Sequence, residues 1–211
     1  MKPIKNIIFD LGGVILNLTR NRCIEAFEKL GVKNIRKIIV NNYQQKDLFM
    51  SLEYGQVTPE EFYDEARRIW SLQLSDEDIK QAWILMLDDI QPYKLDLLLK
   101  LRSKYNVVLL SNTNEIHWEH IANNLFAYKG HVVSDFFDSI YLSNELHMQK
   151  PNADIFEYVL KDSGFKAEET LLIDDALPNC KTAEALGMQT YAPKPREDWS
   201  FLFEDKEHGK V

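Results

Sequence analysis

The chain has 211 residues, of which 45% are hydrophobic and 27% charged, and its formal net charge is −8. This composition is typical of a globular protein with a substantial core and excludes a disordered chain. The acidic balance argues against nonspecific nucleic-acid binding, and no apolar run has the length of a membrane span. Cys23 and Cys180 are far apart and indicate neither a disulfide framework nor a zinc site, so we expect a cytoplasmic location.

An apolar run near the start of the chain ends in a carboxylate, and two glycines follow shortly after it. Residues 7–9 predict a buried strand, which places Asp10 at its carboxyl end, where open α/β sheets bind ligands. Gly12 and Gly13 allow a sharp turn whose amides point at an anion. A carboxylate is costly to bury there unless a metal or a reaction needs it. An aspartate that merely caps a turn is the competing interpretation.

Residues 18–90 predict helices alone, placed between the first strand and all later strands. The expected signals are Asn17 or Thr19 as the first helix cap, Gly31 as its stop, a helix over 44–52, a capping box at Thr58 and Glu61, and a cap at Ser75 with Asp78. We therefore expect an inserted helical subdomain over 18–90, with residues 1–17 and 91–211 together forming the main domain.

From Pro92 onwards, helical and strand patterns alternate along the chain. The expected strands are 107–110, 139–142, 170–173 and 189–192, and the expected helices are 93–104, one containing Trp118 and Leu125, one opened by Asn152 and Asp154, and one ending at Leu186. This alternation predicts right-handed crossovers and a parallel sheet covered on both faces. The fold class is therefore α/β, a Rossmann-like parallel sheet flanked by helices, with an inserted all-helical subdomain.

The carboxyl ends of parallel strands meet at one edge of the sheet, and polar residues follow several of these ends. They are Asp10, Ser111, Asn112, Asp174 and Asp175, with Lys150 from a nearby loop. Three carboxylates at one edge cannot all stay ionised without a cation, and oxygen ligands suit Mg²⁺. Lys150 and Ser111 supply the charge and the hydrogen bond that a phosphate needs. This set predicts attack by Asp10 on phosphorus and an aspartyl-phosphate that water hydrolyses.

Four short motifs, in a fixed order, carry a resemblance to a known family. They are residues 9–14 (Phe-Asp-Leu-Gly-Gly-Val), 110–113 (Leu-Ser-Asn-Thr), 150–151 (Lys-Pro) and 173–175 (Ile-Asp-Asp), with Asn179 following. With these motifs the chain resembles the haloacid dehalogenase-like hydrolase superfamily along nearly its whole length. The helical insert is similar to the family's small helical cap, which closes over the site and shapes substrate choice.

The resemblance implies a role for each motif residue in a Mg²⁺-dependent phosphatase acting on a small phosphorylated metabolite. Asp10 is the nucleophile and a metal ligand, and Lys150 and Ser111 act in catalysis. The implied phosphate-binding residues are Ser111, Asn112, Lys150, Leu11 and Gly12, and the implied Mg²⁺ ligands are Asp10, the Gly12 carbonyl, Asp175, and Asp174 directly or through water. Asn179 is expected to brace the acidic loop.

One position departs from the family pattern. Family phosphatases usually have a second aspartate two residues after the nucleophile as general acid and base, and here that position is Gly12. General acid catalysis supplies about a hundred- to ten-thousand-fold in rate, so we expect a less basic leaving group, such as that of a sugar 1-phosphate or an acyl phosphate. The motifs are most similar to those of the bacterial α-D-glucose-1-phosphate phosphatase subgroup, so we expect a sugar phosphate as substrate.

Two other functions stay open at this point. A haloacid dehalogenase would use Asp10 without a metal, although the acidic pair at 174–175 argues against it. A catalytically weak protein that binds a phosphorylated metabolite would keep the phosphate site, and Gly12 is the only reason to consider it. We expect a monomer or a weak homodimer.

Several other residues invite a functional interpretation that the sequence does not favour. His117 and His120 have the spacing of a metal pair on a helix, but no third ligand is evident. Phe62, Trp70 and Trp83 are expected in the core of the helical subdomain rather than as a platform for a sugar.

Overall fold

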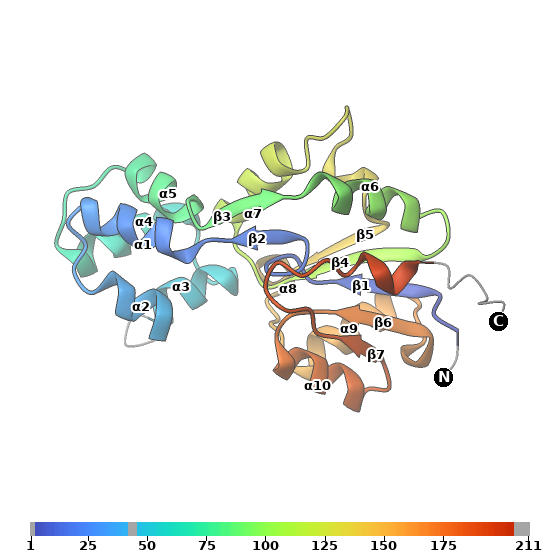
Figure 1. Ribbon diagram of the computed structural model, residues 1–211. Helices are drawn as coiled ribbons and strands as arrows, with labels where there is room; N and C mark the ends of the chain where they lie inside the picture. The colour runs from blue at the N-terminus through green and yellow to red at the C-terminus, as the bar shows by residue number, and fades with distance from the viewer. Residues whose placement is uncertain (1–2, 42–45, 205–211) are drawn as a thin grey trace.

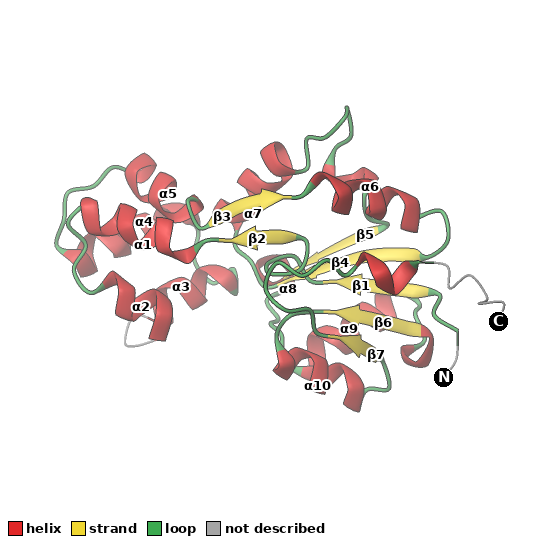
Figure 2. Ribbon diagram, in the orientation of Figure 1, coloured by secondary structure: helices red, strands yellow, loops and turns green. Residues whose placement is uncertain are grey.

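The computed structural model describes residues 3–41 and 46–204, and a parallel five-stranded sheet is its centre (Figures 1 and 2). The strand order is β5-β4-β1-β6-β7. The strands are β1 (Asn6–Phe9), β4 (Asn106–Ser111), β5 (Ser139–Leu142), β6 (Thr170–Ile173) and β7 (Gln189–Tyr191). Phe9 at the end of β1 pairs with Leu109 on one side and Ile173 on the other. The carboxyl ends of β1, β4 and β6 therefore lie next to one another, and the predicted fold class is confirmed.

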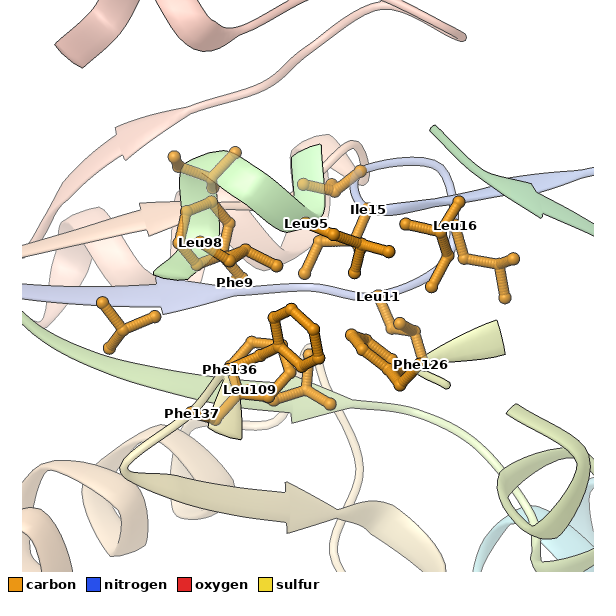
Figure 3. Close-up of a cluster of buried hydrophobic side chains, with 14 of the residues drawn as sticks. Phe9, Leu11, Ile15, Leu16, Leu95, Leu98, Leu109, Phe126, Phe136 and Phe137 are labelled. Atoms are coloured by element: carbon orange, nitrogen blue, oxygen red, sulfur yellow. The ribbon is translucent and has the colours of Figure 1, made fainter. Parts of the chain in front are cut away.

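Side chains of β1 alternate between two separate cores, as a strand buried on both faces requires. Ile7 and Phe9 pack with α6 (Pro92–Leu101) and its neighbours in one cluster (Figure 3). Ile8 packs on the other face, against α9 (Ala153–Ser163) and α10 (Leu177–Ala185). The sheet is thus covered by helices on both faces.

The turn that follows Asp10 is held from behind by two buried side chains. The carbonyl of Val14 accepts hydrogen bonds from Lys94 Nζ at 2.5 Å and from Trp199 Nε1 at 3.0 Å. The Trp199 ring also packs on Phe9, with 5.0 Å between ring centroids. Burial lowers the pKa of Lys94, although Asp198 and Asp89 oppose this change. These contacts fix the turn relative to the sheet.

A helical lobe extends from the sheet domain and has a hydrophobic core of its own, which includes Phe27, Phe62 and Trp83 (Figure 1). Its helices are α1 (Arg20–Lys29), α2 (Ile35–Asn41), α3 (Lys46–Glu53), α4 (Pro59–Trp70) and α5 (Asp76–Ile84). Trp70 is partly buried and packs edge-on against Phe27. We propose residues 18–90 as the cap and residues 1–17 with 91–211 as the core domain.

The expectation of helices alone over 18–90 is wrong at both ends of this range. β2 (Leu16–Leu18) and β3 (Leu87–Ile90) pair as an antiparallel ribbon that leads into and out of the lobe. Thr19 is the N-cap residue of α1, but neither Thr19 nor Asn17 makes a side-chain capping hydrogen bond, because β3 carboxylates take both side chains. Asn17 donates to Asp89 at 2.8 Å, and the Thr19 hydroxyl donates to Asp88 at 2.8 Å.

The remaining helices differ from expectation mainly at their ends. The helix expected over 93–104 ends at Leu101, and α7 (Glu115–His120) continues as a π-helical turn over Ile121–Leu125. α8 (Ser143–Leu146) is one short turn, and 3₁₀ turns cover Val133–Asp135, Ala167–Glu169 and Ser200–Phe203. Of the helix expected over 44–52, residues 44–45 lie outside the described part of the chain. None of the described helices is both long and apolar enough to cross a bilayer.

The capping box at the start of α4 is confirmed and provides a test of its contribution to stability. Thr58 Oγ1 accepts from the Glu61 amide at 3.2 Å, and the Glu61 carboxylate accepts from the Thr58 amide at 2.9 Å. We predict that Thr58→Ala lowers the free energy of unfolding by about 1 kcal/mol in urea denaturation. Gln91→Ala is the control, because Gln91 precedes α6 without a side-chain cap and its loss should cost less than about 0.5 kcal/mol. Equal losses in both variants would contradict the prediction.

Candidate functional site

Three carboxylates gather at the carboxyl edge of the sheet, as the sequence predicts. Asp10 directly follows β1, while Asp174 and Asp175 directly follow the neighbouring strand β6. One oxygen from each of these carboxylates lies within 4.8 Å of the others. A search of the described residues for acidic, histidine and cysteine side chains close enough together to hold a metal ion finds these three aspartates.

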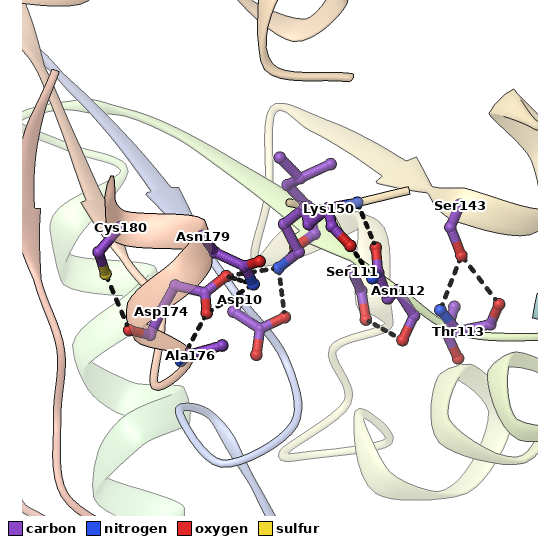
Figure 4. A network of polar contacts seen from close by, with 11 residues as sticks. Asp10, Ser111, Asn112, Thr113, Ser143, Lys150, Asp174, Ala176, Asn179 and Cys180 are labelled. Atoms are coloured by element: carbon purple, nitrogen blue, oxygen red, sulfur yellow. Dashed lines mark hydrogen bonds and ion pairs between the residues drawn. The ribbon is translucent and has the colours of Figure 1, made fainter. Parts of the chain in front are cut away.

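Lys150 places its ammonium group inside this cluster (Figure 4). Its Nζ atom is 2.8 Å from Asp10 Oδ1, 2.6 Å from Asp174 Oδ2 and 2.9 Å from the carbonyl of Leu110. The residue is only 4% exposed. An ammonium group has three protons to donate, and each has an acceptor here. Lys150 therefore links the ends of three adjacent strands.

The charges at this edge do not balance with the lysine alone. Burial raises the pKa of Asp10 to about 7, with Lys150 opposing the rise and Asp174 adding to it. Burial and the Asp174 charge also raise the pKa of Asp175. Burial would lower the pKa of Lys150, but Asp10 and Asp174 raise it overall, so this ammonium stays charged. The remaining negative charge and the oxygen-only donor set fit a hard divalent cation such as Mg²⁺.

The two adjacent aspartates have different surroundings. Asp174 is fully buried, and its carboxylate accepts from the Ala176 amide and from Asn179 Nδ2, each at 2.9 Å, besides Lys150 (Figure 4). Asn179 thus braces the acidic loop, as expected. Asp175 is exposed at the same edge. Of this adjacent pair, Asp175 therefore has more oxygen acceptor sites left for an added ion than Asp174 has.

Ser111 and Asn112 lie beside Lys150 but are not equivalent. The Asn112 side chain makes two hydrogen bonds to the backbone of Lys150. Its Nδ2 donates to the Lys150 carbonyl at 2.9 Å, and its Oδ1 accepts from the Lys150 amide at 3.0 Å. Its side chain therefore supports the lysine loop, which leaves its backbone amide for a phosphate. The Ser111 hydroxyl makes only a long contact of 3.5 Å, to the Asn112 carbonyl, within the described structure. That hydroxyl is free to bind a ligand.

The two glycines after Asp10 are constrained differently. Gly13 has a φ of +84°, and a Cβ there would lie 2.3 Å from Asp175 Oδ2, so a side chain is excluded by both strain and space. Gly12 has no such backbone strain, but a Cβ there would lie 3.0 Å from Leu18 Cδ1. Leu18 therefore fills the space that a longer side chain at position 12 would occupy.

A cavity of about 340 Å³ opens where the helical lobe meets this edge of the sheet. Its lining from the sheet domain includes Leu11, Gly12, Ser111, Asn112 and His117, and its lining from the lobe includes Arg20, Glu53 and Trp83. The volume is that of a pocket for a small ligand. The cavity joins the predicted phosphate site to polar groups of the lobe.

Arg20 and Glu53 were not singled out from the sequence. Glu53 is the last residue of α3, where a negative charge interacts unfavourably with the helix dipole. This unfavourable position is the feature of the sequence that could have marked Glu53 as a candidate. Gln149 Nε2 donates to Glu53 Oε2 at 3.1 Å. Burial raises the pKa of Glu53 to about 7, while the hydrogen bond from Gln149 and the charge of Arg20 oppose the rise.

The loop that begins at Glu53 docks directly onto the sheet domain. The Ser143 hydroxyl donates to the Glu53 carbonyl at 2.7 Å. Gly55 has a φ of +62°, and a Cβ at this position would lie 2.0 Å from the carbonyl oxygen of Asn144. The backbone of the lobe therefore touches the backbone of the sheet domain, and only glycine allows this approach.

His117 is a structural residue. Its Nδ1 faces Asn114 Nδ2 at 3.3 Å and its Nε2 faces the Trp83 carbonyl at 3.2 Å, so Nε2 carries the proton. Burial lowers the pKa of His117 to about 4, which keeps the ring neutral. With both ring nitrogens engaged, it forms no metal pair with His120.

Comparison with known proteins places this site in a family. The family model for haloacid dehalogenase-like hydrolases matches residues 4–187. A D-ribitol-5-phosphate phosphatase of Bacteroides thetaiotaomicron is 36% identical over 196 residues, which are 93% of this chain and 95% of that protein.

Solved structures agree with this assignment. A HAD family enzyme from Bacteroides thetaiotaomicron, in complex with magnesium and inorganic phosphate, is 49% identical and superposes with a TM-score of 0.91, covering 95% of this chain and 100% of that one. A predicted HAD-like hydrolase from Porphyromonas gingivalis is 38% identical, with a TM-score of 0.88 over 96% of this chain and 97% of that one. The chain belongs to the haloacid dehalogenase-like hydrolase family.

Proposed function

We propose that this protein is a Mg²⁺-dependent phosphatase that hydrolyses a small phosphate monoester of a sugar or polyol through transfer of the phosphoryl group to Asp10. The observation that carries the proposal is the position of the Lys150 ammonium group, bonded to both Asp10 and Asp174 beside the free hydroxyl of Ser111. A nucleophilic carboxylate thus lies next to groups that bind a phosphate.

The roles follow from the contacts of each group. Asp10 attacks phosphorus, and Lys150 neutralises charge on the transferred phosphoryl group. The Ser111 hydroxyl donates to a phosphoryl oxygen, and the backbone amides of Leu11, Gly12 and Asn112 bind the others. Asn179 acts at a distance by holding Asp174, and through it Lys150, in place.

The ligands proposed for Mg²⁺ are Asp10, the Gly12 carbonyl and Asp175, with Asp174 reaching the ion directly or through water. The ion supplies the positive charge that lets Asp10 stay ionised despite its raised pKa. The solved relative with bound magnesium and inorganic phosphate supports Mg²⁺ as the ion.

The lobe side of the cavity favours a leaving group with hydroxyls. Glu53 and Arg20 contribute polar groups to its lining. A polyhydroxy chain satisfies such groups, and the relative named as a D-ribitol-5-phosphate phosphatase supports this substrate class. The sugar 1-phosphate expected from Gly12 then becomes one member of a wider class that includes primary alkyl esters.

We further propose that the protein works as a monomer or weak homodimer in the cytoplasm, without nucleic-acid or membrane partners. Both cysteines are buried free thiols, and the net charge of −8 disfavours polyanions.

The first test is phosphate release from a panel of sugar and polyol phosphates, with Mg²⁺ and with a chelator. We predict metal-dependent release that Asp10→Asn reduces by at least roughly a thousandfold, because the amide is not a nucleophile. Asp96→Asn is the matched control, since Asp96 pairs with Lys129 at the surface and should keep full activity. Tight binding of a phosphorylated ligand without release by the intact protein would support a binding protein instead.

Docking of the lobe is testable at Gly55. Gly55→Ala should lower kcat/KM by about tenfold or more, because the clash with Asn144 moves the lobe side of the cavity away from the phosphate site. Gly164→Ala is the matched control, since Gly164 also has a positive φ of +70° but open space around its Cβ position. The control should lose stability without losing activity. Similar losses of kcat/KM in both variants would contradict the prediction that activity depends on the contact between Gly55 and Asn144.

A further inference from the structure

The proposed reaction leaves one proton without a donor, and this inference rests on that proposed function. When a primary alkyl phosphate transfers its phosphoryl group, the departing oxygen is a strongly basic alkoxide that needs a proton. Gly12 cannot supply it. Leu18 Cδ1 lies 3.0 Å from where a Cβ of residue 12 would be, so this space is filled by an apolar group.

The other titratable or cationic groups of the cavity and of the adjoining carboxylate cluster are unsuited to this task. Lys150 donates to three acceptors and is held in its charged form by Asp10 and Asp174. His117 is neutral, and its ring proton is donated to the Trp83 carbonyl. Arg20 cannot be deprotonated in a protein. Among the described residues that line the cavity, Glu53 is the remaining group that can exchange a proton.

Glu53 lies on the lobe side of the cavity, opposite the phosphate-binding residues of the sheet domain. Its Oε2 accepts from Gln149, the neighbour of Lys150 in sequence, and no described residue provides a hydrogen-bond partner for Oε1. Its backbone is fixed by the Ser143 hydroxyl, and the carbonyl of the next residue, Tyr54, accepts from His147 Nδ1 at 2.8 Å. The side chain is thus positioned by the sheet domain although it belongs to the lobe.

We propose that Glu53 is the catalytic acid and base of this enzyme, replacing the acidic side chain that position 12 lacks.

The reaction has two steps, and Glu53 exchanges one proton in each. As Asp10 Oδ forms a bond to phosphorus, the bond from phosphorus to the ester oxygen breaks, its electron pair stays on that oxygen, and the Glu53 carboxyl proton moves there to give the alcohol. Water then attacks phosphorus, Glu53 accepts one of its protons, and the bond from phosphorus to Asp10 breaks. The products are the alcohol and inorganic phosphate, and Glu53 ends protonated as it began.

The electrostatics agree with such a role. Burial raises the pKa of Glu53 to about 7, so both protonation states are populated near neutral pH. The charged or titratable groups near it are Arg20 on α1, which opposes this rise, and His147 beside Tyr54. For an alkyl phosphate, kcat/KM should therefore fall as pH rises above about 7, because the acid form is lost.

The decisive experiment compares Glu53→Gln with the intact protein on two esters, D-ribitol 5-phosphate and p-nitrophenyl phosphate. The amide of the variant still accepts from Gln149 but has no acidic proton. We expect kcat/KM for the alkyl ester to fall by roughly a hundred- to ten-thousandfold and its decline above pH 7 to disappear. The kcat/KM for the nitrophenyl ester, which reports only the first step, should change less than about fivefold, because its phenolate leaves without a proton. The kcat for this ester should fall, because water attack on the aspartyl-phosphate still needs Glu53 as a base.

Glu145→Gln is the matched control, since Glu145 is an exposed acid on α8, the helix next to Glu53, and does not line the cavity. It should leave kcat/KM for both esters unchanged. Equal losses of kcat/KM on both esters for Glu53→Gln, or no loss on the alkyl ester, would overturn the proposal. A retained kcat/KM for the nitrophenyl ester shows that the variant is folded. If the intact protein releases phosphate from neither ester, the phosphatase function itself fails, and this result is distinct because the nitrophenyl ester needs no acid.

Discussion

The buried ammonium group of Lys150 is the charge on which the arrangement of this edge depends. A carboxylate removed from water without compensation costs several kcal/mol, and here two are buried side by side. Lys150 compensates both charges, because its ammonium group donates to Asp10 after β1 and to Asp174 after β6. It also donates to the Leu110 carbonyl on β4. Asn112 in turn holds the backbone of Lys150. The nucleophile, the phosphate-binding residues and the acidic loop are therefore positioned by one network.

The parts of the molecule that could be predicted from sequence are those set by local pattern. The apolar run at residues 7–9 is followed by Asp10, and the run at 170–173 is followed by Asp174. The sequence therefore predicts both the strands and the polar residues at their ends. Parallel topology then brings these ends to one edge, which is why the sequence alone predicts the convergence of three aspartates and Lys150. The capping box at Thr58 is equally local.

The parts that could not be predicted depend on partners far away in sequence. Asn17 has the chemistry of a helix cap, but its amide is bonded to Asp89, 72 residues away. Asn112 has the chemistry of a phosphate ligand, but its side chain bonds Lys150, 38 residues away. Glu53 enters the cavity only because α3 docks on the segment around Ser143. The chemistry of a side chain limits the interactions that it can make, and long-range packing determines which of those interactions form.

The contact between Trp199 and the turn after Asp10 has a consequence for how the protein is made. Val14 and Trp199 are 185 residues apart, and the family model ends at residue 187, before Trp199. A ribosome therefore releases the nucleophile's strand long before it releases the ring that covers Phe9. Until then the side of Phe9 that Trp199 covers lacks its partner, although α6 belongs to the same core and is made much earlier. The last part of this core is therefore completed only when synthesis of the sheet has ended.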